Sequence, residues 1–241
     1  MYYMTKTLVL YVFHIYNDRV QNFLDKCIFY DDDIDFMIIS NDKNNSVAIP
    51  PGVKSLFREN TGFDFGGWSD AMITGEFYQN YDTFIFINSS AIGPFIPSYY
   101  KGRWTDIYLN GLKDNVKLFG STIATCQNPH LAHVQTYVFA MDKETFEYLI
   151  ICNIFSTWDH AKDMHDAIHN KEIAMSRRII ERGWNIGSLL PYYNGVDFTF
   201  KNKPPEEYGI MFLDDLIYKE HRDILWNEYQ LVFIKGNRGI L

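Results

Sequence analysis

One segment of the chain combines a carboxylate with closely spaced glycines and aromatic rings. It spans residues 59–68 and reads ENTGFDFGGW, with candidate ligand contacts at Asn60, Asp64, Gly66 and Gly67. Glycines allow a ligand to approach the backbone, and Asp64 is an acceptor suited to a ribose or sugar hydroxyl. The spacing differs from the GxGxxG of a dinucleotide loop, and neither GxxxxGKS nor GxxxxGKT occurs, which excludes a P-loop hydrolase. Taken alone, the segment favours a glycine-rich turn with a helix cap.

Polar side chains follow each of the first four predicted strands. His14 and Asn17 follow the first strand, Asp42 the second, Asn60 the third, and Asn88-Ser89-Ser90 the fourth. In an open parallel sheet, ligands bind beyond the carboxyl ends of the strands. Asn, Asp and Ser are also ordinary turn residues. Four such ends in series favour a ligand groove over turn chemistry alone.

Other polar and aromatic candidates occur in the second half of the chain. His133 could hydrogen-bond a donor or an acceptor, although a satisfied structural histidine is the commoner outcome. Trp158 offers a flat ring for a sugar within a polar loop. His165 and His169 have the i, i+4 spacing of zinc ligands. Without an HExxH pattern or an obvious third ligand, we expect no metal site there.

The composition limits the classes of function. Of 241 residues, 47% are apolar and 22% charged, which supports a sizeable core and excludes an intrinsically disordered chain. The net charge of −8 argues against nucleic acid or an anionic membrane as a partner. Three cysteines without a CxxC pair, and no run suited to a membrane span or signal peptide, predict a cytoplasmic protein without an integral membrane segment. The aromatic share of 17% suits a core or a groove for flat, hydroxylated ligands.

The periodicity of the chain predicts the elements that position these residues. Apolar β-rich runs predict strands at 7–15, 34–40, 53–58 and 83–87, with helices at 18–27 and 67–78 between them. Beyond residue 104 the pattern predicts helices at 104–112, 143–151 and 171–182, and strands at 116–123, 135–141 and 231–234. Strands alternating with helices predict an α/β fold with a mostly parallel central sheet flanked by helices. We expect one domain over residues 1–241.

The order of several motifs resembles a known family. ENTGFDFG precedes a strand that ends in FINSSAIGPF (86–95), and LFGSTI (118–123), HVQTYVFA (133–140) and FIKGNR (233–238) follow in order. The chain resembles glycosyltransferases of the GT-A fold, a Rossmann-like fold that binds nucleotide sugars. In particular, it looks like rhamnan-synthesis-related and viral or algal polysaccharide glycosyltransferases. The resemblance covers nearly the whole chain.

The resemblance implies a division of labour along the chain. Residues 1–103 would bind the nucleotide sugar, and residues 104–241 would carry the acceptor and the catalytic groups. The implied donor is a nucleoside-diphosphate sugar, with a UDP-sugar as the default, and the implied acceptor is a glycan hydroxyl. The nucleotide would lie near the first strand ends and Asp64, and the diphosphate would pass Asn88, Ser89 and Ser90.

One departure from the family pattern concerns the metal. In this fold the fourth strand normally ends in a DxD motif that holds Mn²⁺ or Mg²⁺, and here the positions read Asn88-Ser89-Ser90. Hard divalent cations prefer carboxylate oxygens. Either a metal binds weakly at Asn88 and Ser90, mainly through phosphate and water, or cationic side chains neutralise the diphosphate. Lys235 and Arg238 are candidates for that second role, with a solvated basic tail as the alternative.

A candidate general base lies in the segment NKEIAMSRRIIERGWNI at residues 170–186. The segment is similar to the ED-x-x-L-S-x-R…G-W segment of inverting glycosyltransferases, in which the second acid is the base. Glu172 matches that acid, whereas Lys171 stands in place of the first. A carboxylate there could take the proton of the acceptor hydroxyl; the alternative is a helix-start Glu stabilised by the helix dipole. We expect Arg178 to touch phosphate or to pair with Glu172.

These observations predict an inverting glycosyltransferase with Glu172 as base. Two alternatives stay open: a retaining transferase on the same fold, and a sugar- or nucleotide-binding module without catalysis, which the missing DxD suggests. A sugar-nucleotide pyrophosphorylase is disfavoured, because residues 14–18 do not form a glycine-rich, arginine-bearing loop. The sequence does not specify the donor base, the sugar, the acceptor or the oligomeric state.

Overall fold

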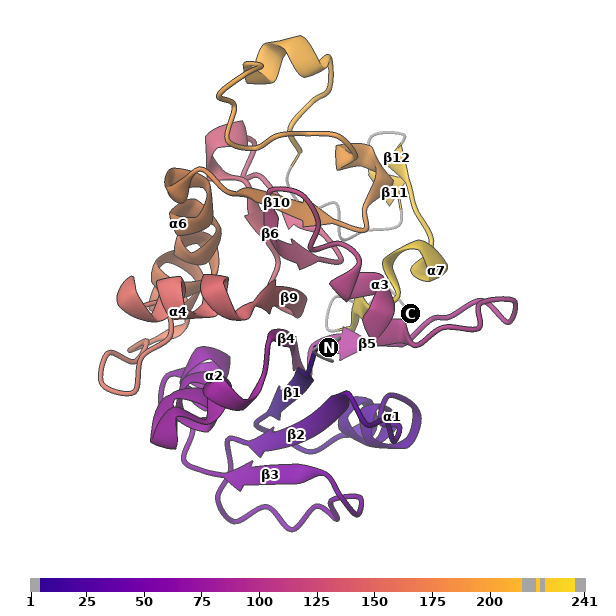
Figure 1. Ribbon diagram of the computed structural model, residues 1–241, viewed down its shortest axis with the longest axis vertical. Helices are drawn as coiled ribbons and strands as arrows, with labels where there is room; N and C mark the ends of the chain where they lie inside the picture. Colours follow the sequence, from indigo (N-terminus) through magenta and orange to yellow (C-terminus); the bar gives the residue numbers. More distant parts are fainter. Residues whose placement is uncertain (1–4, 214–219, 222–223, 237–241) are drawn as a thin grey trace.

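The computed structural model describes residues 5–213, 220–221 and 224–236. Its centre is a seven-stranded sheet in the order β10-β6-β9-β4-β1-β2-β3 (Figure 1). The strands are β1 (Thr7–Phe13), β2 (Ile34–Ser40), β3 (Lys54–Phe57), β4 (Thr83–Asn88), β6 (Val116–Gly120), β9 (Val138–Asp142) and β10 (Asn185–Ser188). Only β9 runs antiparallel to its two neighbours, β4 and β6. The expected α/β fold with a mostly parallel sheet is confirmed.

Helices cover both faces of this sheet (Figure 1). They are α1 (Asp18–Lys26), α2 (Phe63–Ile73), α3 (Trp104–Leu109), α4 (Lys143–Ile151), α5 (Met164–Asp166), α6 (Ala174–Arg182) and α7 (Glu228–Leu231). A π-helical segment, η3 (Ala167–Ile173), joins α5 to α6, so that 164–182 is one continuous helical run. The 3₁₀ segments are η1 (Thr74–Asn80), η2 (Pro129–Leu131), η4 (Pro191–Tyr193) and η5 (Pro205–Tyr208).

Three short strand pairs complete the described structure. They are β5 (Ala91–Ile92) with β13 (Ile234–Lys235), β7 (Ile123–Ala124) with β8 (His133–Val134), and β11 (Glu220–His221) with β12 (Ile224–Leu225). All three pairs are antiparallel. The β5–β13 pair brings the late part of the chain beside the end of β4, where the candidate site lies.

The sheet is buried on both faces, which explains the continuous apolar runs of its strands. All seven side chains of β1 are buried, and alternate residues face the two sides of the sheet. Leu10 packs in the cluster with Phe65 and Phe146 from α2 and α4, whereas Tyr11 packs in the cluster with Phe23 from α1. The 41 Phe, Tyr and Trp residues therefore serve the core in large part, because many of them are fully buried in these two clusters.

Several predicted boundaries are corrected by the structure. The helix expected over 67–78 begins at Phe63, after Gly62 in the left-handed conformation, and becomes a 3₁₀ helix at Thr74. The strand expected over 135–141 begins only at Val138, as β9, and residues 135–137 lie between it and β8. In this interval the Thr122 hydroxyl donates to Oε1 of Gln135 at 2.7 Å. The segment 231–234 ends helix α7 and starts β13 only at Ile234.

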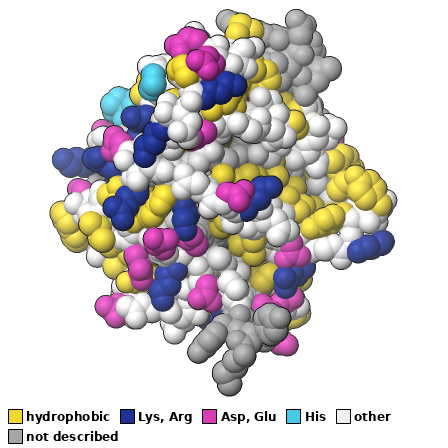
Figure 2. Space-filling view, turned by 45° about the horizontal axis from the view of Figure 1, so that its top comes forward, with side chains coloured by type: hydrophobic (Ala, Val, Ile, Leu, Met, Phe, Trp, Pro, Cys, Tyr) yellow, Lys and Arg dark blue, Asp and Glu magenta, His cyan; other side chains and the backbone are white. Residues whose placement is uncertain are grey.

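The surface carries no single dominant charge on the face shown in Figure 2, where acidic and basic side chains are interspersed. Among the described residues, no helix is both long and apolar enough to span a bilayer.

Candidate functional site

The candidate site lies at the carboxyl end of β4, beside the first turn of α2. Asn88 is the last residue of β4 and is buried. Its Nδ2 donates to Oδ2 of Asp64 at 2.9 Å, and its Oδ1 accepts from the Ser90 amide at 2.9 Å. Two residues that lie apart in sequence, each predicted to bind the donor, therefore contact each other directly.

Glu172 faces the same place from η3. The hydroxyl of Thr136 donates to the Glu172 carboxylate, and the carbonyl of Thr136 accepts from Nδ2 of Asn88 at 3.5 Å. Asp64, Asn88, Thr136 and Glu172 thus form one continuous chain of polar contacts. We refer to it below as the carboxylate bridge. The Glu172 side chain keeps 18% of its surface exposed, so a substrate hydroxyl can reach it.

His133 is the second partner of Glu172. Its Nε2 lies 3.8 Å from Oε1 of Glu172, and its Nδ1 lies 3.0 Å from the carbonyl oxygen of Leu131. Because only a donor satisfies a carbonyl, Nδ1 carries the hydrogen, and Nε2 faces Glu172 as an acceptor unless the ring is protonated. In that tautomer the ring does not hydrogen-bond an ionised Glu172, and its lone pair faces the oxygen that would carry a proton after Glu172 is protonated.

Burial raises the pKa of Asp64 to about 6. The hydrogen bond from Asn88 opposes this rise, the charge of Glu172 adds to it, and Lys235 opposes it. The two carboxylates thus repel each other across the bridge, while one cation in the late part of the chain acts on the same group.

The raised pKa of Asp64 predicts a pH-dependent stability difference between the wild type and Asp64→Asn. The folded protein holds the proton of Asp64 more tightly than the unfolded chain, whose carboxyl titrates near 3.8. The free energy of unfolding of the wild type should therefore fall, relative to the variant, as pH rises from about 4 to about 6, and the difference should level off above that. Urea denaturation at half-unit steps across this range measures the difference. A difference that does not change with pH would contradict the assignment.

Lys171, which stands where the resembled family has an acid, has a structural role here. Its buried Nζ donates to the carbonyls of Asn153 and Asp159 at 2.6 and 2.8 Å. Burial lowers the pKa of Lys171, and the charges of Asp159 and Asp166 oppose that change. The ammonium fixes the 153–159 loop against η3 and thereby fixes the side of the helix on which Glu172 points. The structure places Glu172 well inside a helical run rather than at its start, so the helix-dipole interpretation does not apply.

Arg58 fixes the glycine-rich segment. Its side chain, 9% exposed, donates to Oδ2 of Asp70 at 2.8 Å, to Oδ1 of Asn41 at 2.7 Å and to the carbonyl of Thr61 at 2.7 Å. These contacts join the ends of β2 and β3 to α2. The position of Asp64 in the first turn of α2 depends on this anchor.

Gly66 and Gly67 let α2 approach the sheet closely. A methyl group on Gly66 would lie 2.0 Å from the carbonyl oxygen of Thr61, and one on Gly67 would lie 2.9 Å from Val12. Both positions are buried. Close packing against protein therefore requires these two glycines, and their contact with a donor stays a prediction.

The strand-end residues differ in what they contact. His14 is exposed, with Nδ1 2.8 Å from the carbonyl of Asn41. Asn17 caps α1 by accepting from the amides of Arg19 and Val20, and its contact with a donor stays a prediction. Asp42 accepts from the amide of Asn44, a turn contact, and Asn60 is exposed.

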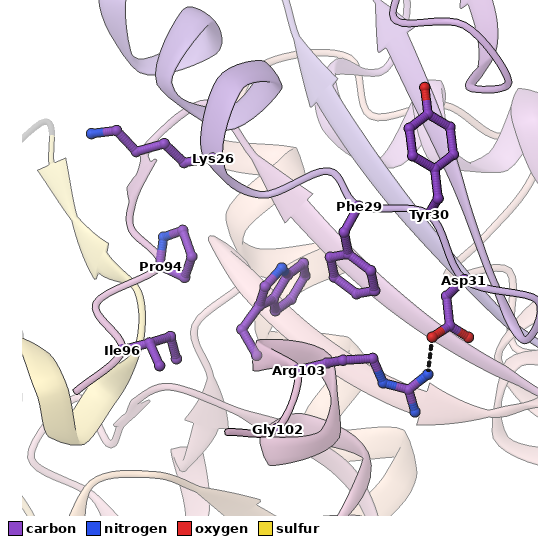
Figure 3. A pocket seen from close by; sticks show the side chains of 9 residues that line it. Lys26, Phe29, Tyr30, Asp31, Pro94, Ile96, Gly102 and Arg103 are labelled. Atoms are coloured by element: carbon purple, nitrogen blue, oxygen red, sulfur yellow. Dashed lines mark ion pairs between the residues drawn. The ribbon is translucent and has the colours of Figure 1, made fainter. Parts of the chain in front are cut away.

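A polar hollow lies among the loops that follow β1 and β2. It has a volume of about 410 Å³ and is lined by Tyr16 and residues 44–48. A separate cavity of about 520 Å³ lies between the end of α1 and the start of α3 (Figure 3). Its lining includes Phe29, Trp104 and Arg103, and Arg103 is held by Asp31 at 2.7 Å. Neither space includes a member of the carboxylate bridge.

The remaining predicted residues lie at different distances from the bridge. Ser89 and Ser90 follow Asn88 directly, and Lys235 pairs with Ala91 across β5 and β13. Trp158 is 74% exposed in the loop that Lys171 holds. Arg178 pairs with Glu181 at 3.0 Å instead of with Glu172. Arg238 lies outside the described residues.

The residues at this site fit a divalent cation poorly. Asp64 and Glu172 supply one carboxylate each, and one oxygen of each already accepts a hydrogen bond, from Asn88 and from Thr136 respectively. The side-chain oxygen of Asn88 is occupied by the Ser90 amide. Within the described parts of the chain, no group of three or more His, Cys, Asp or Glu side chains is placed to hold a metal ion. A hard cation would have to rely on hydroxyls, phosphate and water.

Three contributors to the site were not predicted from the sequence: Arg19, Arg58 and Thr136. Arg19 donates from Nε to the carbonyl of Ser89 at 2.7 Å. Each carried a usable signal. Arg19 lies in the first turn of the predicted helix at 18–27, Arg58 ends the predicted third strand, and Thr136 lies within the HVQTYVFA motif.

Fold and site together define an α/β protein with two linked carboxylates at the carboxyl edge of its sheet. The family model described as rhamnan synthesis protein F matches residues 53–204, more than half of the chain, and the chain belongs to this polysaccharide-synthesis family. Among solved structures, a cytidylyltransferase from Leptospira borgpetersenii serovar Hardjo-bovis (strain JB197) is similar, with 13% identity and a TM-score of 0.34. The similarity covers 61% of this chain and 64% of that one, less than two thirds of its length. No curated protein matches the chain.

Proposed function

We propose that the protein is a glycosyltransferase that moves a sugar from a nucleoside-diphosphate donor to a glycan hydroxyl with inversion at the anomeric carbon. The carboxylate bridge carries this proposal. It holds Glu172 at the edge of the sheet where ligands bind, with one oxygen on Thr136, a histidine behind it and enough exposure for a substrate. Membership of a polysaccharide-synthesis family supports a sugar as the transferred group.

In the proposed reaction, the acceptor oxygen forms a bond to the anomeric carbon as its proton passes to the Glu172 carboxylate. The bond between the anomeric carbon and the phosphate oxygen breaks, and its electron pair leaves with the nucleoside diphosphate. The proton would next pass to Nε2 of His133 after this atom, 3.8 Å from Oε1 of Glu172, approaches to hydrogen-bond distance. General-base catalysis of this kind contributes about 10²- to 10⁴-fold to the rate.

The donor would lie along the strand ends. The hollow beside Tyr16 and residues 44–48 has polar walls and a ring suited to a nucleobase. The diphosphate would lie over Ser89 and Ser90, and Asp64 would accept from a hydroxyl of the ribose or the sugar. Trp158, exposed on its loop, would stack on the acceptor glycan.

A thermal-shift panel of UDP-, GDP- and dTDP-sugars tests the donor class. A ligand at about 100 times its Kd stabilises a protein by about 2.7 kcal/mol. For a chain of this size, each kcal/mol of stabilisation raises the Tm by about 2–4 °C. We expect the sugars of one nucleotide (UDP, GDP or dTDP) to raise the Tm by several degrees. The same donor should release its nucleoside diphosphate when glycan acceptors are added. If no nucleotide sugar shifts the Tm, the proposal is wrong.

The panel also separates the alternatives. The Asn88-Ser89-Ser90 sequence favours a module that binds without catalysis, and such a module would show a Tm shift with no donor turnover under any acceptor or metal. For an active enzyme, NMR of the anomeric proton in the first product distinguishes inversion from retention. Retention would remove Glu172 from the role of base.

A further inference from the structure

The turn between β4 and β5 has its backbone held by two segments that are distant in sequence. Nε of Arg19, in the first turn of α1, donates to the carbonyl of Ser89 at 2.7 Å. The amide of Gly236, just after β13, donates to the carbonyl of Ser90 at 2.7 Å. These carbonyls are therefore used within the protein. What the turn can still offer a ligand is the pair of serine hydroxyls, which have no partner in the described parts of the chain.

Arg19 and Lys235 flank this turn. A methyl group on Gly236 would lie 3.3 Å from Cδ of Arg19, so the arginine side chain packs against the residue next to Lys235. Lys235 itself lies opposite Ala91 in the β5–β13 pair. Its positive charge lowers the pKa of Asp64 and so opposes the rise that burial causes. Two cations, one from each end of the chain, are thus gathered where the resembled family has its metal-binding carboxylates.

We propose that Arg19 and Lys235 together bind the diphosphate of the donor and do so without a divalent cation. This inference rests on the function proposed above. Nε of Arg19 is used to hold the turn, whereas Nη1 and Nη2 have no partner among the described residues and remain as donors for phosphate oxygens. Lys235 adds a second positive charge.

The same two cations would act on the leaving group. When the bond from the anomeric carbon breaks, the electron pair stays on the phosphate oxygen, which gains negative charge. Arg19 and Lys235 would stabilise that charge, and no proton needs to be transferred to the leaving nucleoside diphosphate. Charge balance supports this, since a donor diphosphate carries two negative charges before the transfer.

Calorimetric titration with UDP, GDP and dTDP tests the inference, each in EDTA and in Mn²⁺. We expect the wild type to bind one of them equally well in both conditions. Arg19→Gln and Lys235→Gln should each weaken that binding about tenfold or more, because each removes a charge-assisted contact. Arg19→Lys should lose less affinity, since it keeps the positive charge but lacks the two parallel N–H donors of the guanidinium group. Lys26→Gln, on the exposed last turn of α1, is the matched control and should bind as the wild type does.

Three results would overturn the inference: binding that requires Mn²⁺, wild-type affinity in both glutamine variants, or no binding of any nucleoside diphosphate. If Arg19→Gln does not fold, Lys235→Gln serves as the test alone, because Lys235 lies on a two-residue edge strand. The function proposed above fails separately. A protein that binds the diphosphate through these two cations but turns over no nucleotide sugar would keep the inference and lose the glycosyltransferase.

Discussion

Replacing Glu172 by Gln should lower kcat about 10²- to 10⁴-fold and leave the affinity for the nucleoside diphosphate unchanged. Gln keeps an oxygen that can accept from Thr136, so the carboxylate bridge and the position of η3 should survive. What is lost is the negative charge that takes the acceptor proton. Single-turnover kinetics with the donor found in the panel measures the effect.

Glu144→Gln is the matched control for this change. Glu144 lies in the first turn of α4, 65% exposed, and pairs with Lys117 at 3.0 Å. It should reduce neither kcat nor affinity. Glu172→Gln should also lower the pKa of Asp64, because the Glu172 charge contributes to its rise. Wild-type turnover in Glu172→Gln would refute the general-base role, and an unchanged titration of Asp64 would refute the coupling across the bridge.

Arg58→Met should cost about 3 kcal/mol of the free energy of unfolding. The side chain is nearly buried, and its removal leaves Asp70, Asn41 and the Thr61 carbonyl without a donor. We place the cost at the low end for a broken buried pair, because Asp70 stays 30% exposed and keeps some solvent. Urea denaturation at neutral pH measures the change.

Arg178→Met provides the comparison for stability. Its side chain is 52% exposed and pairs only with Glu181, also exposed, among the described residues. Surface pairs of this kind contribute little, so we expect a change below about 0.5 kcal/mol. Equal costs for the two variants would show that Arg58 is not an anchor. A selective loss in Arg58→Met, with a lower affinity for the donor, would link the anchor to the position of Asp64.

The strands and most helices could be predicted from the sequence because their signals are local. Buried strands such as β1 and β4 are continuous apolar runs, and Asn17 caps α1 as its residue type suggests. The start of α2 was misplaced because Gly62 and Phe63 both adopt positive φ, a turn geometry that periodicity does not report. The strand predicted at 135 begins only at Val138; the side chain of Gln135 instead accepts from the Thr122 hydroxyl, a long-range contact that periodicity does not report.

The sequence indicated several residues of the candidate site but none of the contacts that join them. Asp64, Asn88 and Glu172 were each found from residue type and motif, yet the hydrogen bonds that join them pass through Thr136, whose neighbours are 36 and 48 residues away. Arg19 and Lys235 flank the turn between β4 and β5 only because β13 pairs with β5. No local sequence pattern indicates that pairing. Long-range pairing of this kind is what a single sequence does not contain.

The π-helical turn before α6 makes the length of that helix a part of the chemistry. An α-helix turns by about 100° per residue, and a π-helical turn accommodates an additional residue within an otherwise α-helical run. Deleting one residue between Ala167 and Lys171 would convert η3 into a regular α-helix. If α5 kept its position, Glu172 would rotate away from Thr136. If Glu172 kept its position, α5 would rotate instead. The number of residues between the start of η3 and Glu172 therefore sets the direction in which the Glu172 side chain points.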